Sequence, residues 1–527
     1  MCQPLLLQNG LIVTERSTYI GSVLIIDDLI ADVGTVINYP SDSLFIDCTG
    51  MILLPGGIDP HVHLEYYQGP NKIRSADDFF TGSVAASLGG TTCLIDFCET
   101  TDGQHFESAI ETRKREISKS VLPIGLHQTI SAVDLDRMGG SLSLSEVETA
   151  IRKGISSFKV YTAYRGLYIN DKQFTEIAVK MNREFSQQAI IIVHAEDNFV
   201  FESQVKYCRE NGLVDPRYIT QTRPGTGEAN ATLSICNIMS SLPKPSPLLT
   251  PLGLHFVHVS AIESARVIEN YAHLNITGEV CVQHLSLTED IYKSSNILER
   301  GMGVMAPVLR TEADNNYLFD QLKKEKQIHM TVTDHCPFTS KQRFGLKRLP
   351  DLIFDNDKKR LVSSAHEEKW HASTPTEMVP SPNTSTHPPF YEMPGGTAGI
   401  QLRVPIVINE ARKRNFSWEQ IGRIISTNAA KRFGMFSKYG SIEKGKKASI
   451  LVWNPSIKCT VKVVGASCPE AAKPGDVVEN IDVSLYEGRE IEGWPWYVFS
   501  NGQKLVEEAR FVGEPGMGGF LERYLHQ

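Results

Sequence analysis

The segment MILLPGGIDPHVH, residues 51–63, is the first of eight short apolar segments whose spacing decides the fold. The other seven are TTCLIDFC (91–98), LPIGLHQTIS (122–131), SSFKVYTAY (156–164), AIIIVHAED (189–197), LGLHFVHVS (252–260), NITGEVCVQHL (275–285) and HMTVTDHCP (329–337). The intervals between them are long enough for helices, and some, such as ESAIETRKREISKS, have the pattern of an amphipathic helix. Apolar strands that alternate with helices predict a parallel sheet covered on both faces. Eight such units predict an α/β protein built on a (β/α)8 TIM barrel.

The two ends of the chain differ from this middle part. Residues 1–50 and the part after Gly440 read as hairpin strands with turn residues between them, as in LLLQNGLIVTERSTYIGSVLIIDD and SIEKGKKASILVWNP. Neither end is large enough for a good core of its own, so we expect both to form one small composite β-sandwich domain. The predicted organisation is 1–54 as the first part of that domain, 55–440 as the barrel, and 441–527 as the second part with a C-terminal tail.

A long segment, roughly Phe338 to Met393, follows the eighth predicted strand. It becomes polar and rich in Pro, Ser and Thr toward its end, and it is long for a loop. Because it leaves the barrel where active sites of this architecture lie, we expect a partly mobile cover near the mouth of the pocket.

Composition limits the classes of partner. The 527 residues include 41% hydrophobic and 22% charged residues, and the formal net charge is −8. This balance is typical of a globular protein with a sizeable core, and the lack of a basic block argues against a nucleic-acid or anionic membrane partner. The first residues do not read as a signal peptide, no apolar run is long enough to span a membrane, and the scattered cysteines form no C-x-x-C pair. Buried free thiols in a reducing cytosol are the better interpretation of these cysteines, so we expect a cytoplasmic protein.

Side chains that bind metals lie at the ends of five of the predicted strands. They are His61 and His63, Lys159, His194, His258 and Asp334. Because residues i and i+2 of a strand face the same way, the two histidines of the first strand can both point into the barrel. One His-x-His pair arises easily by chance, but six potential ligands at the strand ends where barrel active sites lie predict a metal site.

Lys159 is the unusual member of this set. Its ammonium has no lone pair, and deprotonating it at neutral pH costs roughly 4–5 kcal/mol. Carboxylation by CO2 would give an anionic carbamate whose two oxygens can bridge two divalent ions about 3.5–4 Å apart. Such a centre makes a water nucleophilic near neutral pH, and we expect Asp334 to take the proton and return it to the leaving nitrogen.

Each of these residues also has a structural interpretation. A buried histidine taken alone is more often a satisfied core side chain than a ligand, Lys159 could form a plain ion pair, and Tyr164 could be an ordinary half-buried tyrosine. Asp59 is in register with His61, and a partner that orients this histidine and a structural carboxylate are equally good interpretations. We interpret four further residues near strand ends as core or supporting groups: His127, His284, His335 and Cys336.

Motifs along essentially the whole chain carry a family resemblance. They are GGIDPHVHLE, SFKVYTAYRG, IIVHAED, HFVHVS, GEVCVQHL, MAPVLR, TDHCP, STNAAKRFGMFSKYGSIEKG and GREIEGWPW. In these motifs the sequence resembles the cyclic amidohydrolases, specifically the dihydropyrimidinase and D-hydantoinase branch. The resemblance implies a TIM barrel with a composite β-sandwich, a homotetramer, and a binuclear zinc centre bridged by N6-carboxylysine at position 159.

The resemblance also assigns roles. It implies that one metal takes His61, His63, Lys159 and Asp334, and that the other takes Lys159, His194 and His258. Tyr164 matches the tyrosine that hydrogen-bonds the substrate carbonyl and then the tetrahedral oxyanion. Leu64 and Tyr161 match residues that line the pocket for the ring substituent, and the backbones at Ala306 and Gly395 match positions that hold the ring amides. The family usually shows a serine at the first of these backbone positions and an asparagine at the second, so side-chain control of that loop is lost here.

The expected function is metal-dependent hydrolysis of a cyclic ureide, namely a neutral dihydropyrimidine such as dihydrouracil or dihydrothymine, or a hydantoin, to an N-carbamoyl amino acid. A non-catalytic scaffold of the same fold is the alternative from another class, but it predicts missing ligands and none is missing. Allantoinase and dihydroorotase are the alternatives among enzymes. Allantoinase-type sites usually lack the tyrosine that Tyr164 supplies. Dihydroorotase-type sites place an arginine two residues after His-x-His, where this chain has Glu65, so we expect an anionic ring to be a poor substrate.

Overall fold

The computed structural model describes residues 3–68, 73–101, 103–243, 249–344, 351–355, 360–364 and 387–525. Eight parallel strands form the barrel in the order β6 (Gly57–Val62), β9 (Thr91–Cys98), β10 (Pro123–Thr129), β11 (Ser157–Tyr161), β12 (Ile190–His194), β13 (Gly253–Phe256), β14 (Ile276–Cys281) and β15 (Ile328–Val332). A parallel bridge between Val62 and His335 brings the first strand next to the last. The predicted TIM barrel and its eight strands are confirmed.

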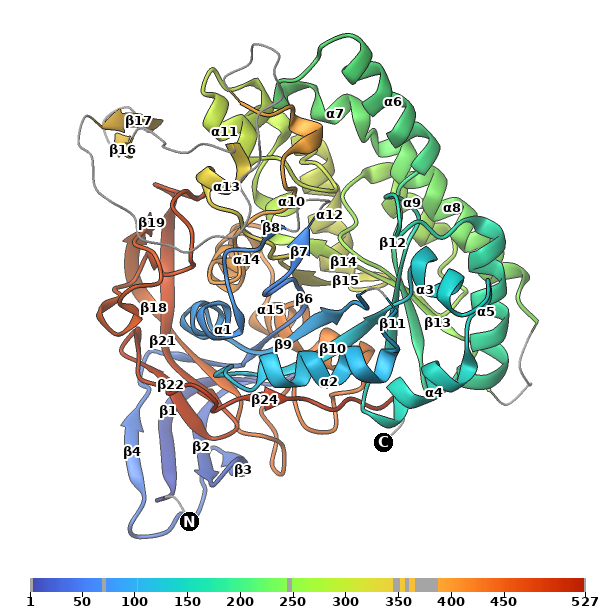
Figure 1. Cartoon of the computed structure of the whole chain (residues 1–527). Coiled ribbons are helices and arrows are strands. Elements are labelled where there is room, and N and C mark those ends of the chain that lie inside the picture. Colours follow the sequence, from blue (N-terminus) through green and yellow to red (C-terminus); the bar gives the residue numbers. More distant parts are fainter. Residues whose placement is uncertain are drawn as a thin grey trace.

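Helices lie between and after the strands and cover the outside of the barrel (Figure 1). They are α1 (Phe79–Leu88), α2 (Phe106–Ile117), α3 (Ala132–Arg137), α4 (Leu144–Arg152), α5 (Asp171–Phe185), α6 (Asn198–Glu210), α7 (Ile219–Thr222), α8 (Gly225–Ser241), α9 (Ile262–Asn270), α10 (Val282–Ser286), α11 (Ile297–Met302), α12 (Glu312–Lys324), α13 (Ser340–Phe344), α14 (Arg403–Lys413), α15 (Trp418–Gly422) and α16 (Asn428–Arg432). Helix α2 shows why they form here: Phe106, Ala109, Ile110 and Ile117 make one buried face of an otherwise charged helix. Within the described part of the chain, no helix is long and apolar enough to cross a membrane.

The segment that we expected to be one strand, residues 51–63, forms two strands in two different sheets. Its first half is β5 (Ile52–Pro55), and its second half is the barrel strand β6. Gly56 separates them, and a Cβ atom at this position would lie 2.3 Å from the side chain of Thr92 on β9. A residue without a side chain is therefore needed where the chain passes from one sheet into the other.

The two chain ends form a second sheet of nine strands, seen as the blue and red strands of Figure 1. Its members are β1 (Leu5–Val13), β2 (Thr18–Ile26), β3 (Leu29–Gly34), β4 (Leu44–Asp47), β5, β18 (Ile450–Thr460), β21 (Glu490–Ser500), β22 (Gln503–Glu507) and β23 (Arg510–Phe511). The ends meet where β5 pairs antiparallel with β18, with Ile52 opposite Trp453 and Pro55 opposite Ile450. The composite β domain is confirmed, and its boundaries at residues 54 and 440 stay a prediction.

Several two-residue strands lie outside these two main sheets or at their margins. Strands β7 (Tyr67–Gln68) and β8 (Ile73–Arg74) pair with each other, as do β19 (Lys462–Val463) and β20 (Asp476–Val477). Strand β24 (Gly519–Phe520) pairs with β10, so the C-terminal tail returns to the barrel. There the buried guanidinium of Arg523 donates a hydrogen bond of 3.0 Å to Ser157 Oγ, which anchors the tail.

The predicted cover lies largely outside the described residues. The hairpin β16 (Asp351–Asp355) and β17 (Arg360–Ser364) is antiparallel. Both ends of the segment belong to the core, because Phe338, Arg343, Phe344 and Met393 are buried. These ends are therefore structural, and they hold the loops beside the site described next.

Candidate metal centre

The six predicted ligands come together at the carboxyl ends of the barrel strands. His61 Nε2 and His63 Nε2 each lie 3.1 Å from Asp334 Oδ1. His194 Nδ1 lies 2.9 Å from His258 Nε2. The rings of His61 and His258 are 5.4 Å apart between centroids, so these two groups of residues adjoin. Candidate ligand atoms of His61, His258 and Asp334 all lie within 4.8 Å of one another.

Lys159 on β11 is buried in the same place and 1% exposed. Its Nζ lies 5.1 Å from the ring centroid of Phe97 and 4.8 Å from that of Tyr161. The Phe97 ring in turn stacks on His63 with centroids 4.5 Å apart. Burial lowers the pKa of Lys159 to about 8, although the charges of Asp334 and Glu279 act in the opposite direction. The neutral amine, which is the form that reacts with CO2, is therefore far more accessible here than for a lysine in water.

Two buried carboxylates orient two of the histidines. Glu279 on β14 places Oε1 2.5 Å from His61 Nδ1 and Oε2 3.0 Å from His255 Nε2. Glu196, just after β12, places Oε2 2.7 Å from His194 Nε2. Each carboxylate thus occupies one ring nitrogen and leaves the other nitrogen of the ligand histidine facing the cluster. Neither acid was foreseen from the sequence, although Glu196 stands two residues after the predicted ligand His194.

The cluster fits a divalent cation on electrostatic and chemical grounds. Burial alone would lower the pKa of His61, but the carboxylates of Asp334 and Glu279 raise it to about 9. Positive charge is therefore favoured at a buried position. Imidazole nitrogens and carboxylate oxygens are the ligands that zinc takes in proteins, and Nδ1 of His63 is a buried nitrogen without a hydrogen-bond partner among the described residues.

Tyr164 lies directly beside the second pair of histidines. Its ring centroid is 5.0 Å from that of His194. Its hydroxyl donates to Glu196 Oε2 at 3.2 Å and accepts from Arg223 Nη1 at 3.1 Å. Glu196 and Arg223 also form an ion pair with each other. Burial raises the pKa of Tyr164 far above its ordinary value, so the hydroxyl remains a proton donor at neutral pH. Arg223 was not foreseen from the sequence.

Three residues of the site have positive φ angles, which side chains other than glycine rarely adopt. The values are +77° at Tyr164, +37° at His258 and +53° at Asp334. Backbone strain of this kind persists only where the surroundings hold it, and it concentrates at functional sites. Here the amide of Asp334 donates to the carbonyl of His61 at 2.9 Å, which fixes one strained position against the ligand on the neighbouring strand.

Asp59 and the other strand-end histidines support the cluster from outside it. Asp59 accepts from Thr333 Oγ1 at 2.7 Å and from the amide of His61 at 3.3 Å, so it joins β6 to the segment that carries Asp334. In each of the three other strand-end histidines, a ring nitrogen contacts a partner outside the cluster. His127 contacts Ser157 Oγ at 2.6 Å, His284 contacts the Pro307 carbonyl at 3.1 Å, and His335 contacts Asp77 at 3.0 Å. Burial also raises the pKa of the Cys336 thiol, consistent with a packing role.

The two predicted backbone contacts lie in adjacent loops. A Cβ atom at Gly395 would lie 4.0 Å from Cα of Met305, the neighbour of Ala306. The buried guanidinium of Arg343 donates to the carbonyls of Val304 at 2.7 Å and Pro394 at 3.1 Å. One side chain from the start of the 338–393 segment thus clamps both loops.

The predicted lining of the ring-substituent pocket is only partly brought together. The Tyr161 ring lies 5.6 Å from that of His194, beside the cluster. Leu64 is fully buried, and its side chain packs against α1, where a Cβ atom at Gly82 would lie 2.4 Å from Leu64 Cδ2. The aromatic side chain next to the cluster on this side is Tyr66, whose ring lies 5.1 Å from that of His63.

Glu65 does not present an unbalanced charge to the site. It forms ion pairs with Lys119 and, at 3.1 Å, with Arg74. Repulsion of an anionic ring by Glu65, which we expected from the sequence, therefore has no structural support.

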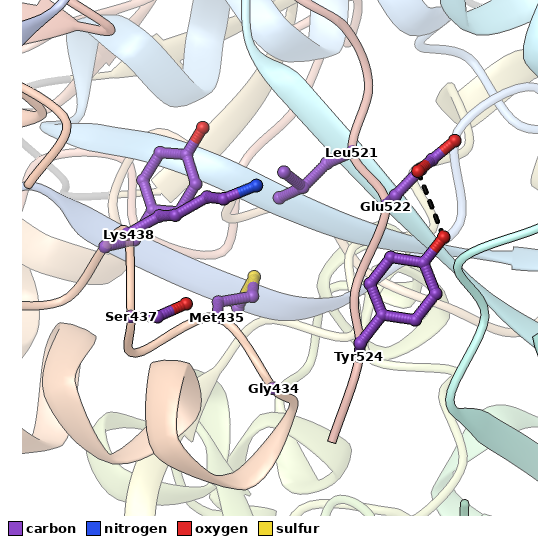
Figure 2. A pocket seen from close by; sticks show the side chains of 8 residues that line it. Gly434, Met435, Ser437, Lys438, Leu521, Glu522 and Tyr524 are labelled. Atoms are coloured by element: carbon purple, nitrogen blue, oxygen red, sulfur yellow. Dashed lines mark hydrogen bonds between the residues drawn. The ribbon is translucent and has the colours of Figure 1, made fainter. Parts of the chain in front are cut away.

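A small pocket elsewhere is unrelated to the cluster. It lies between the segment Gly434 to Tyr439, after α16, and the C-terminal residues Leu521 to Tyr524 (Figure 2). The Tyr524 hydroxyl donates to Glu522 at 3.1 Å across its edge. None of the predicted site residues lines this pocket.

Comparison with known proteins relates the sequence and the fold to one family. The sequence profile of the amidohydrolase family matches residues 52–207 and 255–473. The D-hydantoinase of Geobacillus stearothermophilus is 31% identical over 523 residues, which span 98% of this chain and 96% of that protein. The dihydropyrimidinase of Rattus norvegicus is 26% identical over 98% of this chain and 88% of its own length. The crystal structure of dihydropyrimidinase from Brevibacillus agri superposes with a TM-score of 0.82 at 29% identity, and 100% of each chain is covered. This chain belongs to the amidohydrolase family.

Proposed function

We propose that this protein hydrolyses the cyclic amide bond of a small cyclic ureide, a dihydropyrimidine or a hydantoin, to an N-carbamoyl amino acid. The observation that carries the proposal is the convergence of four histidines, one lysine and one aspartate at the mouth of the barrel. Relatives whose names are D-hydantoinase and dihydropyrimidinase align over nearly the whole chain and support the substrate class.

Two divalent metal ions, most simply zinc, complete the proposed site. His61, His63 and Asp334 would hold one ion, His194 and His258 the other, and the carboxylated side chain of Lys159 both. Metal ions bound in this way lower the pKa of a water and polarise the carbonyl that it attacks. The orienting contacts of Glu279 and Glu196 support this assignment, because each leaves a ligand nitrogen facing inward.

The residues of the chain supply the proton transfers and the orientation. Asp334 uses Oδ1 toward His61 and His63, so Oδ2 is available to accept the proton of the attacking water and return it to the leaving nitrogen. Tyr164 turns its hydroxyl proton from Glu196 to the substrate carbonyl and stabilises the oxyanion that develops there. The backbone groups at Ala306 and Gly395 hold the ring amides, and the Gly395 carbonyl is itself positioned by Gln68 Nε2 at 2.9 Å.

The alternatives make different demands on the same residues. A non-catalytic scaffold does not require all six ligands together with two carboxylates that orient them. An allantoinase or a dihydroorotase would use the same metals. Tyr164 favours a dihydropyrimidinase or hydantoinase over an allantoinase. Family resemblance also supports a homotetramer and a cytoplasmic location, both as part of this proposal.

The test is a substrate panel with metal analysis. Purified protein is assayed against dihydrouracil, hydantoin, a 5-substituted hydantoin, allantoin and dihydroorotate, before and after chelation and metal return. Turnover of dihydrouracil or hydantoins that is lost on chelation and restored by zinc is the expected result. Metal binding without hydrolysis of any ring would favour the scaffold, and preference for allantoin or dihydroorotate would reassign the substrate.

A further inference from the structure

Arg223 lies in the short link between α7 and α8, and its side chain reaches the site from outside the barrel strands. Only 9% of this side chain is exposed. Its Nη1 donates to the Tyr164 hydroxyl at 3.1 Å and also to Glu196 Oε2. One nitrogen of Arg223 therefore contacts both the proposed oxyanion donor and the carboxylate that orients His194.

Glu196 places a buried negative charge beside the group that is to stabilise an oxyanion. Its Oε2 lies 3.2 Å from the Tyr164 hydroxyl and 2.7 Å from His194 Nε2. An unpaired carboxylate at this distance would hold the hydroxyl proton strongly and would repel negative charge that develops on the substrate. Since the same carboxylate orients His194, its charge has to be offset by a cation close by.

The guanidinium of Arg223 supplies this cation and also sets the direction of the hydrogen bond that Tyr164 makes. The ion pair between Arg223 and Glu196 offsets the carboxylate charge. A guanidinium can only donate, so the phenol oxygen accepts from it and keeps its single proton for Glu196 or for a substrate oxygen. A donor at the phenol oxygen also makes the hydroxyl a stronger donor in turn. Arg223 therefore acts on the Tyr164 hydroxyl directly and through Glu196.

Contacts to both its backbone and its side chain hold Arg223 in place. Arg310 Nη1 donates to the carbonyl of Arg223 at 2.5 Å, and Arg310 Nε donates to Ser260 Oγ at 3.0 Å. Ser260 stands two residues after the proposed ligand His258. The guanidinium of Arg223 lies over the Phe201 ring, 4.2 Å from its centroid. Its position is therefore fixed relative to the metal cluster, as the support of a catalytic group requires.

We propose that Arg223 is a positioning residue for the hydrolysis: it offsets the charge of Glu196 and holds the Tyr164 hydroxyl as a donor to the substrate carbonyl. This inference rests on the proposed function, because it concerns how the oxyanion of that reaction is stabilised. Arg223 acts through the hydroxyl, so its contribution belongs to kcat and exists only while the hydroxyl is present. A role confined to folding, or to the orientation of His194 by Glu196, would not depend on the hydroxyl.

The experiment is a double-mutant cycle on the metal-loaded full chain, with hydantoin or dihydrouracil as substrate. It compares the wild type, Arg223→Gln, Tyr164→Phe and the double variant, and the zinc content of each is measured. Arg223→Gln should lower kcat by roughly tenfold or more with little change in KM, as for loss of one charge-assisted contact. In the Tyr164→Phe background the same substitution should lower kcat by less than about twofold. Arg217→Gln removes a half-exposed arginine and should leave kcat unchanged in both backgrounds.

The outcomes separate this inference from the proposed function. An Arg223→Gln effect on kcat that is equal with and without the Tyr164 hydroxyl, whether large or absent, would overturn the positioning role and leave the proposed function intact. If Arg223→Gln does not fold, the cycle is run with Arg223→Lys, which keeps a shorter cation beside Glu196, and equal effects in the two backgrounds would again overturn the role. Wild-type protein with full metal content that hydrolyses neither ring would contradict the proposed function itself, and this inference with it.

Discussion

Removal of the Tyr164 hydroxyl is the sharpest test of the proposed chemistry, because the structure predicts that Tyr164→Phe changes little else. The ring keeps its place beside His194, 5.0 Å between centroids, and beside Phe201, 5.8 Å. Glu196 and Arg223 lose one shared neighbour but stay paired with each other, so no buried charge is left alone. The two hydrogen bonds that disappear are long, at 3.2 and 3.1 Å. We therefore expect the free energy of unfolding to change by no more than about 1 kcal/mol.

The effect on catalysis should be much larger. A donor aimed at a developing oxyanion is worth about 10²–10³ in kcat, or about 2.7–4 kcal/mol, when it is removed. Since the hydroxyl rests on Glu196 before reaction and meets the substrate oxygen most strongly in the transition state, kcat should fall while KM changes little. No limb of the pH profile between about pH 6 and 9 should belong to Tyr164, because burial holds its pKa far above that range.

The assay is steady-state hydrolysis of dihydrouracil or hydantoin by wild type, Tyr164→Phe and the control Tyr168→Phe, with metal content and thermal unfolding measured in parallel. Tyr168 lies four residues along the chain and is 36% exposed, so its hydroxyl should be dispensable. A Tyr164→Phe enzyme with full metal content and wild-type kcat would refute the oxyanion role. A variant that loses its metals would show instead that the tyrosine supports His194.

Three further outcomes follow from the site. Lys159→Ala should lose most bound metal and nearly all activity, and small carboxylic acids should partly restore the activity. Mass spectrometry should find the mass of one additional CO2 on the wild type and not on the variant. A variant that keeps its metals and its activity would contradict the carbamate bridge. Glu279→Gln should weaken metal binding by about 10- to 100-fold, because His61 loses the charge that orients it. Titration with zinc measures the metal affinity, and an affinity equal to that of the wild type would contradict this role of Glu279. Dihydroorotate should be hydrolysed roughly tenfold or more slowly than dihydrouracil, because Arg223, the arginine beside Tyr164, is already paired with Glu196 and is not free to bind the carboxylate of this ring. Equal kcat/KM values for the two substrates would contradict the substrate assignment but not the metal site.

The barrel could be predicted because its signal is local and repeated. Each parallel strand is buried on both faces and therefore reads as an apolar run, and each run is followed by enough chain for a helix. The same regularity placed the ligands: the carboxyl end of each strand faces the same side of the barrel, so His61, Lys159 and His194 had to come close whatever the loops do. The division of residues 51–63 between two sheets escaped this reasoning, because an apolar run does not show which sheet each half joins.

Strand alternation gives no guidance on side-chain direction beyond the end of a strand. Strand β6 ends at Val62, and the chain then turns, with φ of +49° at Glu65. Beyond that point odd and even positions no longer mark inside and outside. Leu64 consequently packs on α1, and Glu65 meets Lys119 and Arg74 rather than the substrate region.

The roles of the acidic residues were harder to predict than those of the metal ligands, because they depend on which side chains each carboxylate pairs with. Glu65 drew attention in the sequence because it follows His-x-His, whereas Glu279 lies unremarked in an apolar strand and Glu99 follows one. Among the described residues the first is neutralised by two cations, the second is bound to two histidines, and the third keeps a buried oxygen without a hydrogen-bond partner. A carboxylate acts on a ligand only with the charge that its neighbours leave it, and those neighbours come from distant parts of the chain. The pairing visible in the structure therefore leaves Glu65 without a net charge to act on a substrate and gives Glu279 the task of orienting His61.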